Sequence, residues 1–126
     1  MWKTYVLPFA KDGYTLISPA CTNSPSGIQW YKDFFNGCHD CQISILATHY
    51  YGTDPKAMIN YLIELHDMFN KDIWVTEFAC MDFTYRHKCD NPFGFLATVK
   101  AFMDKTPWVT AYFAFGTIYY SGITLR

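Results

Sequence analysis

The chain has 126 residues, of which 51% are hydrophobic, 20% aromatic and 17% charged, and its formal net charge is −1. These values are typical of one globular domain and exclude a disordered tail or a fibrous repeat. The near-neutral charge gives no electrostatic basis for binding nucleic acid, and no uncharged apolar stretch reaches the roughly 20 residues that cross a bilayer. Residues 1 to 10 lack the apolar core of a secretory signal, so we expect either a cytosolic protein or a chain whose true beginning is missing.

Four short runs rich in β-branched and aromatic residues are predicted to be buried strands. In chain order they are Tyr14 to Ser18, Ile43 to His49, Ile73 to Phe78 and Val109 to Phe115. Each of the three stretches between them opens with a polar residue followed by Pro, which is the pattern of a helix N-cap and the first helical position. These pairs are Ser24-Pro25, Asp54-Pro55 and Asn91-Pro92. The sequence therefore predicts three helices that alternate with four strands.

The alternation and its spacing define the expected fold. The strands begin at residues 14, 43, 73 and 109, which predicts parallel strands joined by right-handed crossovers. A (β/α)8 barrel allots roughly 31 residues to each unit, although an open doubly wound sheet has a similar rhythm. Polar and aromatic residues gather where each strand ends, and no Gly-rich turn between strand and helix offers a phosphate site. We therefore predict an α/β fold, half of a (β/α)8 barrel with about four parallel strands and three helices.

Two strand-end residues are the candidates for chemistry. Glu77 closes the apolar run Ile73 to Val75, where an ionised carboxylate needs compensation, and His49 ends the preceding strand. Active sites of parallel α/β folds lie at the carboxyl ends of strands, so a hydrogen bond between these two side chains would orient the carboxylate. Either residue also fits a structural role, as a loop cap or a satisfied histidine. Aromatic residues expected at the same rim could stack on sugar rings, namely Tyr50, Tyr51, Phe78 and Tyr112 or Phe113.

Five cysteines admit three interpretations. Cys38 and Cys41 could form half of a zinc site, but Cys80 and Cys89 would complete it only with an unusual spacing. A thioredoxin-like redox pair needs a helix N-terminus, whereas the Cys38 motif precedes a strand. Local disulfides, Cys38 with Cys41 and Cys80 with Cys89, are the interpretation we favour, and they would leave Cys21 unpaired in an oxidising compartment.

Several ordered blocks together resemble the fungal glycoside hydrolase family 128, the alkali-sensitive-linkage-like endo-β-1,3-glucanases. The blocks are Ile17 to Asn23, Cys38-x-x-Cys41, His49 to Gly52, Ile73 to Cys80 and Val109 to Gly116. The resemblance implies that residues 1 to 126 are one partial glycoside hydrolase catalytic domain, the C-terminal half of the barrel with strands five to eight. It also supports the two local disulfides, and it implies an extracellular or cell-wall location, no metal or organic cofactor, and β-glucan as the ligand.

The resemblance also implies roles for individual residues. Glu77 corresponds to the nucleophile of a retaining glycosidase, and His49 and Tyr51 fall on the sixth-strand block of the substrate site. Phe78 and Tyr112 are expected to contact substrate beside them. The family's acid/base glutamate, in an Asn-Glu-Pro block, has no counterpart here.

The missing acid/base glutamate leaves alternatives open. A retaining mechanism needs a second carboxyl group, for which Asp54 and Asp82 are the candidates in loops after strands. Two substitutions also depart from the family pattern: Ser44 stands where many relatives have Asp, and Tyr50 where Trp is common. A non-catalytic glucan-binding or interaction module is the second hypothesis, and a truncated gene model the third. A missing N-terminal half or a homodimer would complete the barrel.

Overall fold

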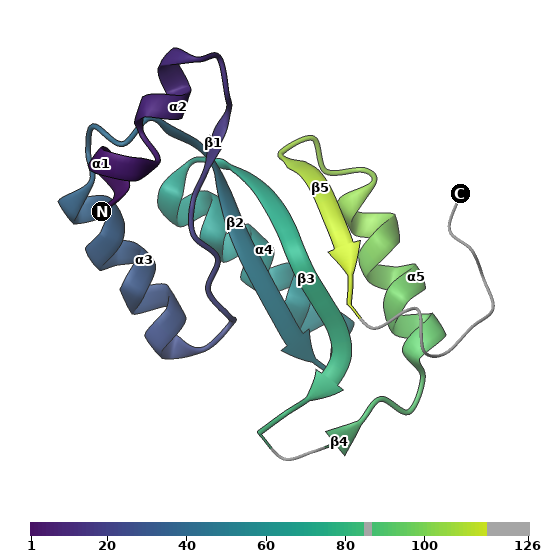
Figure 1. The fold of residues 1–126 in the computed structure, drawn as a ribbon. Helices are drawn as coiled ribbons and strands as arrows, with labels where there is room; N and C mark the ends of the chain where they lie inside the picture. The colour runs from purple at the N-terminus through teal and green to yellow at the C-terminus, as the bar shows by residue number, and fades with distance from the viewer. Residues whose placement is uncertain (85–86, 116–126) are drawn as a thin grey trace.

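The computed structural model describes residues 1–84 and 87–115. Its central feature is a parallel sheet in the order β1 (Leu16–Ile17), β2 (Ile43–Gly52), β3 (Asp72–Asp82) and β5 (Val109–Ala114) (Figure 1). The predicted fold class is confirmed: the described residues form four parallel strands and three long crossover helices, as in half of a (β/α)8 barrel. Gly116, the end of the last sequence block, lies outside the described residues.

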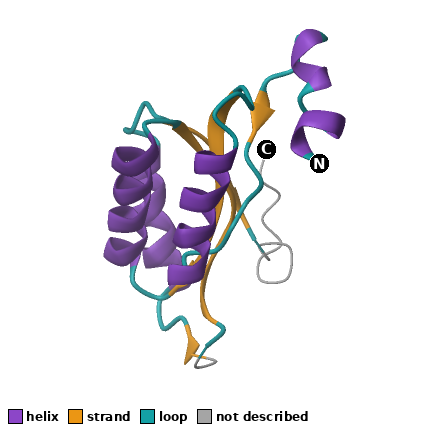
Figure 2. Ribbon diagram, turned by 90° about the vertical axis from the view of Figure 1, so that its left-hand side faces the viewer, coloured by secondary structure: helices purple, strands orange, loops and turns teal. Residues whose placement is uncertain are grey.

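The three predicted helices are α3 (Pro25–Gly37), α4 (Pro55–Phe69) and α5 (Pro92–Met103). Their N-caps follow the predicted pattern, because the side chain of Ser24 accepts from the Gly27 N–H, that of Asp54 from Lys56 and that of Asn91 from Gly94. All three helices lie on one side of the sheet (Figure 2).

The core lies between that face of the sheet and the helices. Its members include residues predicted to form the apolar stripes of the helices and the interior of the strands. The most completely buried are Tyr31, Leu46, Met58, Leu62, Leu65, Ile73, Val75, Phe78 and Val99. Burial of these large side chains against one face is what holds the helices on the sheet.

Three short elements were not predicted from the sequence. Two four-residue helices, α1 (Trp2–Tyr5) and α2 (Pro8–Lys11), precede β1, and the two-residue β4 (His87–Lys88) pairs antiparallel with the end of β3. The Trp2 indole N–H donates to the Cys41 carbonyl at 3.1 Å, so α1 is attached to the loop after α3. Strand β1 is shorter than expected, whereas β2 and β3 extend beyond the predicted ends and carry the rim of the sheet.

Candidate active site

The parallel pairing of β2 and β3 brings the two candidate residues side by side. His49 is the register partner of Glu77, as the sequence predicts for neighbouring strand ends. The register shifts between Thr48 and His49, immediately before this pair, and the bulge there turns the following side chains relative to the rest of the strand. The site therefore lies at the rim of the sheet, just beyond the point where the regular strand pairing is interrupted.

Glu77 has two polar partners, and both contact the same carboxylate oxygen. The Tyr51 hydroxyl donates to Glu77 Oε2 at 2.5 Å, and His49 Nδ1 lies 3.5 Å from that oxygen. The side chain of Glu77 remains 37% exposed and that of His49 25% exposed. A carboxylate that is oriented by a donor and remains partly exposed has the geometry of a nucleophile or a general base.

Tyr51 stays a hydrogen-bond donor over the whole physiological range. Burial, together with the hydrogen bond to Glu77 and the negative charge of Glu77, raises the pKa of Tyr51 to about 12. Its ring is also enclosed by aromatic neighbours, since Phe83 lies 4.9 Å and Phe115 6.0 Å from it, both edge to face. Phe83 and Phe115 are 61% and 54% exposed, so they extend an apolar surface beside the carboxylate.

Asn23 fixes the main chain of Tyr51. Its side-chain amide donates to the Tyr51 carbonyl at 3.1 Å and accepts from the Tyr51 N–H at 3.0 Å. The sequence analysis did not single out Asn23, Phe83 or Phe115 as site residues. The one available signal for Asn23 was its position, a polar residue directly before the N-cap Ser24.

Two residues predicted to contact substrate lie elsewhere in the structure. Phe78 is 1% exposed in the core, because it follows Glu77 on the strand and consecutive side chains point to opposite faces. Tyr112 packs edge to face on Phe78, and its hydroxyl donates to Asp104 Oδ1 at 2.5 Å at the end of α5. The structure therefore corrects the expectation for both residues: they face the helix layer and not Glu77.

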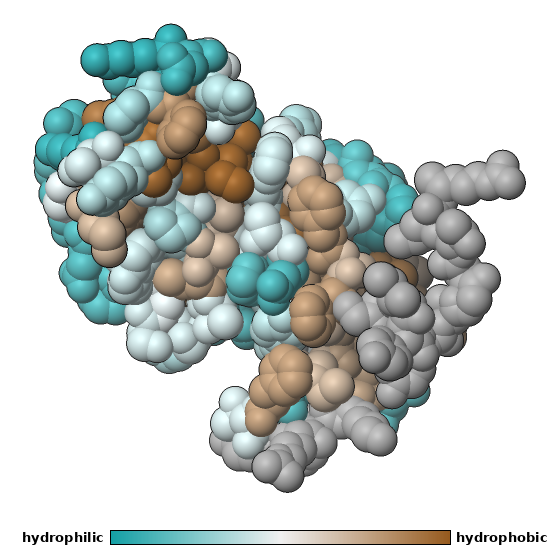
Figure 3. Space-filling model, in the orientation of Figure 1, coloured by the Kyte–Doolittle hydropathy of each residue, from teal (hydrophilic) through white to brown (hydrophobic). Residues whose placement is uncertain are grey.

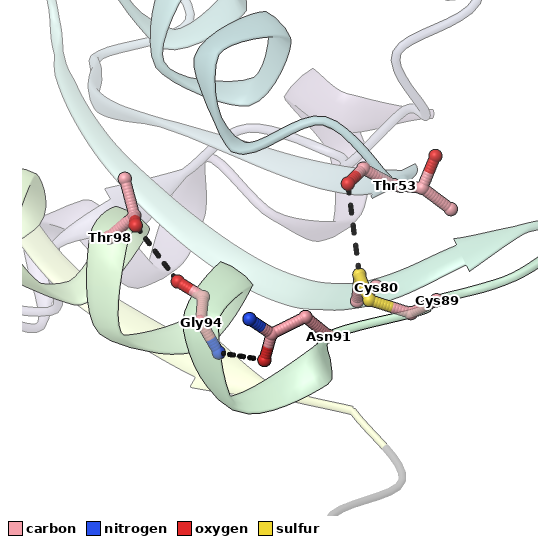
Figure 4. The surroundings of a disulfide bond; sticks show 6 residues. All are labelled: Thr53, Cys80, Cys89, Asn91, Gly94 and Thr98. Atoms are coloured by element: carbon pink, nitrogen blue, oxygen red, sulfur yellow. Dashed lines mark hydrogen bonds between the residues drawn. A yellow bond between two sulfur atoms is a disulfide. The ribbon is translucent and has the colours of Figure 1, made fainter.

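The cysteines form the two predicted disulfides. Cys38 bonds to Cys41 and Cys80 to Cys89, and Cys21 is free. The second bond joins the end of β3 to the segment before α5, close to the Thr53 carbonyl (Figure 4). The zinc interpretation therefore loses its thiolate ligands, and Cys38 lies at the C-cap of α3, not at the helix N-terminus that a thioredoxin-like redox pair needs. No group of three or more His, Cys, Asp or Glu residues that could hold a metal occurs within residues 1–84 and 87–115.

Neither candidate for a second carboxyl group is free at the site. Asp54 Oδ1 caps α4 by accepting from the Lys56 N–H at 2.8 Å. Asp82 Oδ1 accepts from the Thr84 N–H at 2.8 Å in the turn after β3. Both carboxylates thus have structural partners, and Glu77 is the one carboxylate in the described part of the chain that we place in the site.

A hollow of about 340 Å³ lies at the other end of the strands. Its lining includes Phe35, Ile43 and Lys71, and the Lys71 ammonium donates to the Ile43 carbonyl at 2.8 Å. Active sites of this fold type lie at the carboxyl ends of strands, so this hollow at the amino ends is not assigned to the site.

None of the helices in the described ranges is long and apolar enough to cross a membrane.

A parallel α/β half barrel with an oriented carboxylate and aromatic side chains at its carboxyl rim is typical of glycoside hydrolases, and the comparisons place the chain in this class. The model of the glycosyl hydrolase catalytic core family matches residues 1–124. The chain belongs to this family, and within it to glycoside hydrolase family 128.

Three relatives illustrate the similarity. An exo-β-1,3-glucanase of family 128, subgroup VI, from Aureobasidium namibiae is 32% identical, with a TM-score of 0.82 over 91% of this chain and 46% of its own. A subgroup VII oligosaccharide-binding protein from Cryptococcus neoformans shares the fold, at 23% identity and a TM-score of 0.70 over 90% of this chain and 46% of its own. Alkali-sensitive linkage protein 1 of Schizosaccharomyces pombe is 37% identical over 78 residues, which are 60% of this chain and 14% of that protein.

The matches cover most of this chain but only a part of each relative. The chain spans less than half of the solved structures it resembles, and 14% of the curated relative. What those proteins do as wholes is therefore considered for this chain only as a proposal.

Proposed function

We propose that residues 1–126 form one partial glycoside hydrolase catalytic domain, strands five to eight of the barrel, which acts on β-1,3-glucan with Glu77 as the nucleophile. The observation that carries the proposal is the strand-end carboxylate of Glu77, oriented by the Tyr51 hydroxyl at 2.5 Å and left partly open. Family membership supports the substrate class, since the solved relative with 32% identity is a β-1,3-glucanase.

In the proposed reaction Glu77 attacks the anomeric carbon and the glycosidic oxygen leaves. The product of this step is a covalent glycosyl-enzyme, which water then hydrolyses with net retention of configuration. The leaving oxygen needs a proton from a second carboxyl group about 5 to 5.5 Å from the first. We propose that this acid lies outside this chain, either in a missing N-terminal half or in a partner half barrel such as a second copy.

Substrate contacts in this proposal come from His49, Tyr51 and the exposed rings of Phe83 and Phe115. His49 and Tyr51 flank the carboxylate, and the two phenylalanines extend the apolar surface on which the face of a sugar ring can pack. Two disulfides fit an oxidising compartment, which supports an extracellular or cell-wall location.

The nucleophile can be tested without the missing acid. A 2-deoxy-2-fluoro-β-laminaribiosyl fluoride carries a leaving group that departs as fluoride without protonation, so only the attacking carboxylate is needed. We expect intact-mass spectrometry to show one glycosyl adduct on the purified chain, and peptide mapping to place it on Glu77. The Glu77→Gln variant should form none.

A matched control is the other glutamate of the chain. Glu64 lies exposed on α4, so Glu64→Gln should label like the wild type. Absence of an adduct on a folded chain that binds laminari-oligosaccharides would contradict a nucleophilic Glu77. That result would instead favour the second candidate, a non-catalytic glucan-binding module, whose fold precedent is the subgroup VII oligosaccharide-binding protein.

A further inference from the structure

The loop between β1 and α3 runs beside β2 after β1 has ended. Cys21 forms an isolated parallel bridge with Thr48, and the His49 N–H donates to the Cys21 carbonyl at 2.9 Å. Two residues later, Asn23 makes its two side-chain hydrogen bonds to the main chain of Tyr51. The loop therefore follows β2 to the rim, first with its main chain and then with one amide side chain.

Asn23 acts at a place where, among the described residues, β2 has a strand on one side only. On its other side Tyr51 is in register with Ala79 of β3, whereas β1 ended at Ile17. The amide of Asn23 donates and accepts once each, as a neighbouring strand would, and so completes the pairing of Tyr51. Fixing the main chain at this position fixes the direction in which the long phenol ring leaves it.

The ring of Tyr51 ends on Glu77. From Asn23 to Glu77 the chain of contacts has only two links: the paired amide bonds of 3.0 and 3.1 Å, and the hydroxyl bond of 2.5 Å to Oε2. We propose that Asn23 is a positioning residue for Glu77, which acts by holding the Tyr51 hydroxyl on the carboxylate. This inference rests on the proposed role of Glu77 and adds a residue that touches neither glucan nor the carboxylate.

The loop that carries Asn23 is itself fixed to the core. The buried Tyr31 hydroxyl accepts from the Cys21 N–H at 2.7 Å and donates to the Ala47 carbonyl at 2.7 Å. The Thr48 hydroxyl shares a bond of 2.7 Å with the Tyr61 hydroxyl, also inside the core. Asn23 therefore projects from a rigid base, which a positioning residue needs if it is to transmit orientation.

The hydroxyl proton of Tyr51 reports this arrangement directly. A phenol proton donated to a carboxylate resonates downfield of one that faces water, and proton NMR at low temperature can observe it. Tyr51→Phe assigns the signal by removing it, and Glu77→Gln should move it upfield because a neutral amide accepts more weakly. We expect Asn23→Ala to abolish the signal while circular dichroism shows a folded chain.

The control is Asn91→Ala, which removes another capping amide, the one that accepts from the Gly94 N–H at the start of α5, and should leave the signal in place. Asn23→Asp serves as the milder variant, because it keeps the acceptor for the Tyr51 N–H and loses the donor. We expect its signal to shift upfield of the wild type. An unchanged signal in folded Asn23→Ala or Asn23→Asp, or an equal loss in Asn91→Ala, would overturn the proposal.

This readout is independent of the proposed enzyme activity. If no covalent adduct forms but the Tyr51 signal depends on Asn23, the nucleophile assignment fails and the structural link stands. If the adduct forms on Glu77 and the signal does not depend on Asn23, the positioning role fails alone.

Discussion

Tyr51 connects three parts of the molecule through one side chain. Its main chain is held by Asn23, its hydroxyl orients Glu77, and its ring packs against Phe83 and Phe115. Because its pKa is raised to about 12, the phenol remains protonated and can donate to Glu77 at neutral pH. At the scale of single residues, the site therefore depends on Tyr51 as much as on the carboxylate.

Replacing Tyr51 by Phe should slow covalent labelling of Glu77. The variant keeps the ring and its packing but removes the donor that fixes Oε2, and small misplacements of a reacting group cost roughly 10- to 100-fold in rate. We expect a decrease of that size in the rate of adduct formation, and intact-mass spectrometry over time measures this rate. Tyr14→Phe, at an exposed position away from the site, should label at the wild-type rate. Equal rates for both variants would show that Tyr51 does not orient the nucleophile.

The residues of the site differ in how far the sequence reveals them. Glu77 and His49 could be predicted because each closes an apolar run, and strand ends of parallel sheets meet at one rim. The expectation that Phe78 and Tyr112 contact substrate fails, because Phe78 follows Glu77 on β3 and so points to the opposite face, where Tyr112 packs against it. Asn23 has only its place before the N-cap Ser24 as a sequence signal, because its proposed role depends on β1 ending at Ile17.

At the scale of elements, local rules decide where the helices begin. All three polar-Pro pairs form side-chain caps, so the long helices could be predicted from spacing and N-cap chemistry. Helices α1 and α2 and strand β4 are too short to show a period, and they form through contacts such as that of Trp2 with the Cys41 carbonyl. A hydrophobic period reveals helices and strands long enough to bury one face. The three short elements have no such period, and their formation depends on contacts with neighbouring segments.

The first turn of α3 requires glycine at position 27. A Cβ added to Gly27 would lie 2.2 Å from the Thr22 carbonyl oxygen, a main-chain atom that cannot rotate away. We expect Gly27→Ala to lower the free energy of unfolding by about 1 to 3 kcal/mol and to displace the loop that carries Asn23. Urea unfolding measures the first effect and the Tyr51 hydroxyl signal the second.

Gly37 provides the comparison for Gly27. It ends the same helix, and nothing lies within 4 Å of an added Cβ. Gly37→Ala should therefore change stability by less than about 0.5 kcal/mol and leave the hydroxyl signal in place. A loss of stability in Gly37→Ala as large as in Gly27→Ala would mean that the contact with Thr22 is not the cause.

The two disulfides should differ in what they contribute. Cys80 and Cys89 are 9 residues apart and Cys38 and Cys41 are 3 apart, and the longer loop loses more freedom when it is closed in the unfolded chain. The chain-entropy relation gives about 2.6 kcal/mol for the first and about 1.6 kcal/mol for the second. Urea unfolding of the two double Cys→Ser variants tests this order. A larger loss for the Cys38 pair would show that native contacts, and not loop length, set the difference.

At the scale of the whole molecule, the three long helices of the described residues all cover the same face of the sheet. Helices α3, α4 and α5 pack on one side, whereas the side seen in Figure 3 presents hydrophobic side chains to solvent. The exposed aromatic rings include Phe83, Phe113 and Phe115, and within residues 1–84 and 87–115 the edge strands β1 and β5 each pair on one side. The half-barrel fold could be predicted from strand spacing, but no local pattern identifies what lies against this open face.

Stability at high pH depends on tyrosines of the core. Burial raises the pKa of Tyr31 to about 12 and also raises that of Tyr61, from an ordinary value of 10. A group whose pKa is higher in the folded state stabilises the fold fully below its unfolded pKa and loses this contribution as the pH rises through the folded value. The free energy of unfolding should thus be level from about pH 7 to 9 and fall between about pH 10 and 12.

Tyr31→Phe separates this effect from ordinary loss of contacts. At pH 7 the variant should be less stable by about 1 to 3 kcal/mol, because the Cys21 N–H and the Ala47 carbonyl lose their partner. Between pH 9 and 11 it should lose about 1.4 kcal/mol less than the parent, the share that follows from moving one pKa from 10 to about 12. Urea unfolding in a Cys21→Ser background prevents thiol attack on the disulfides. Equal losses in parent and variant would mean that Tyr31 ionises as readily in the folded chain as in the unfolded one.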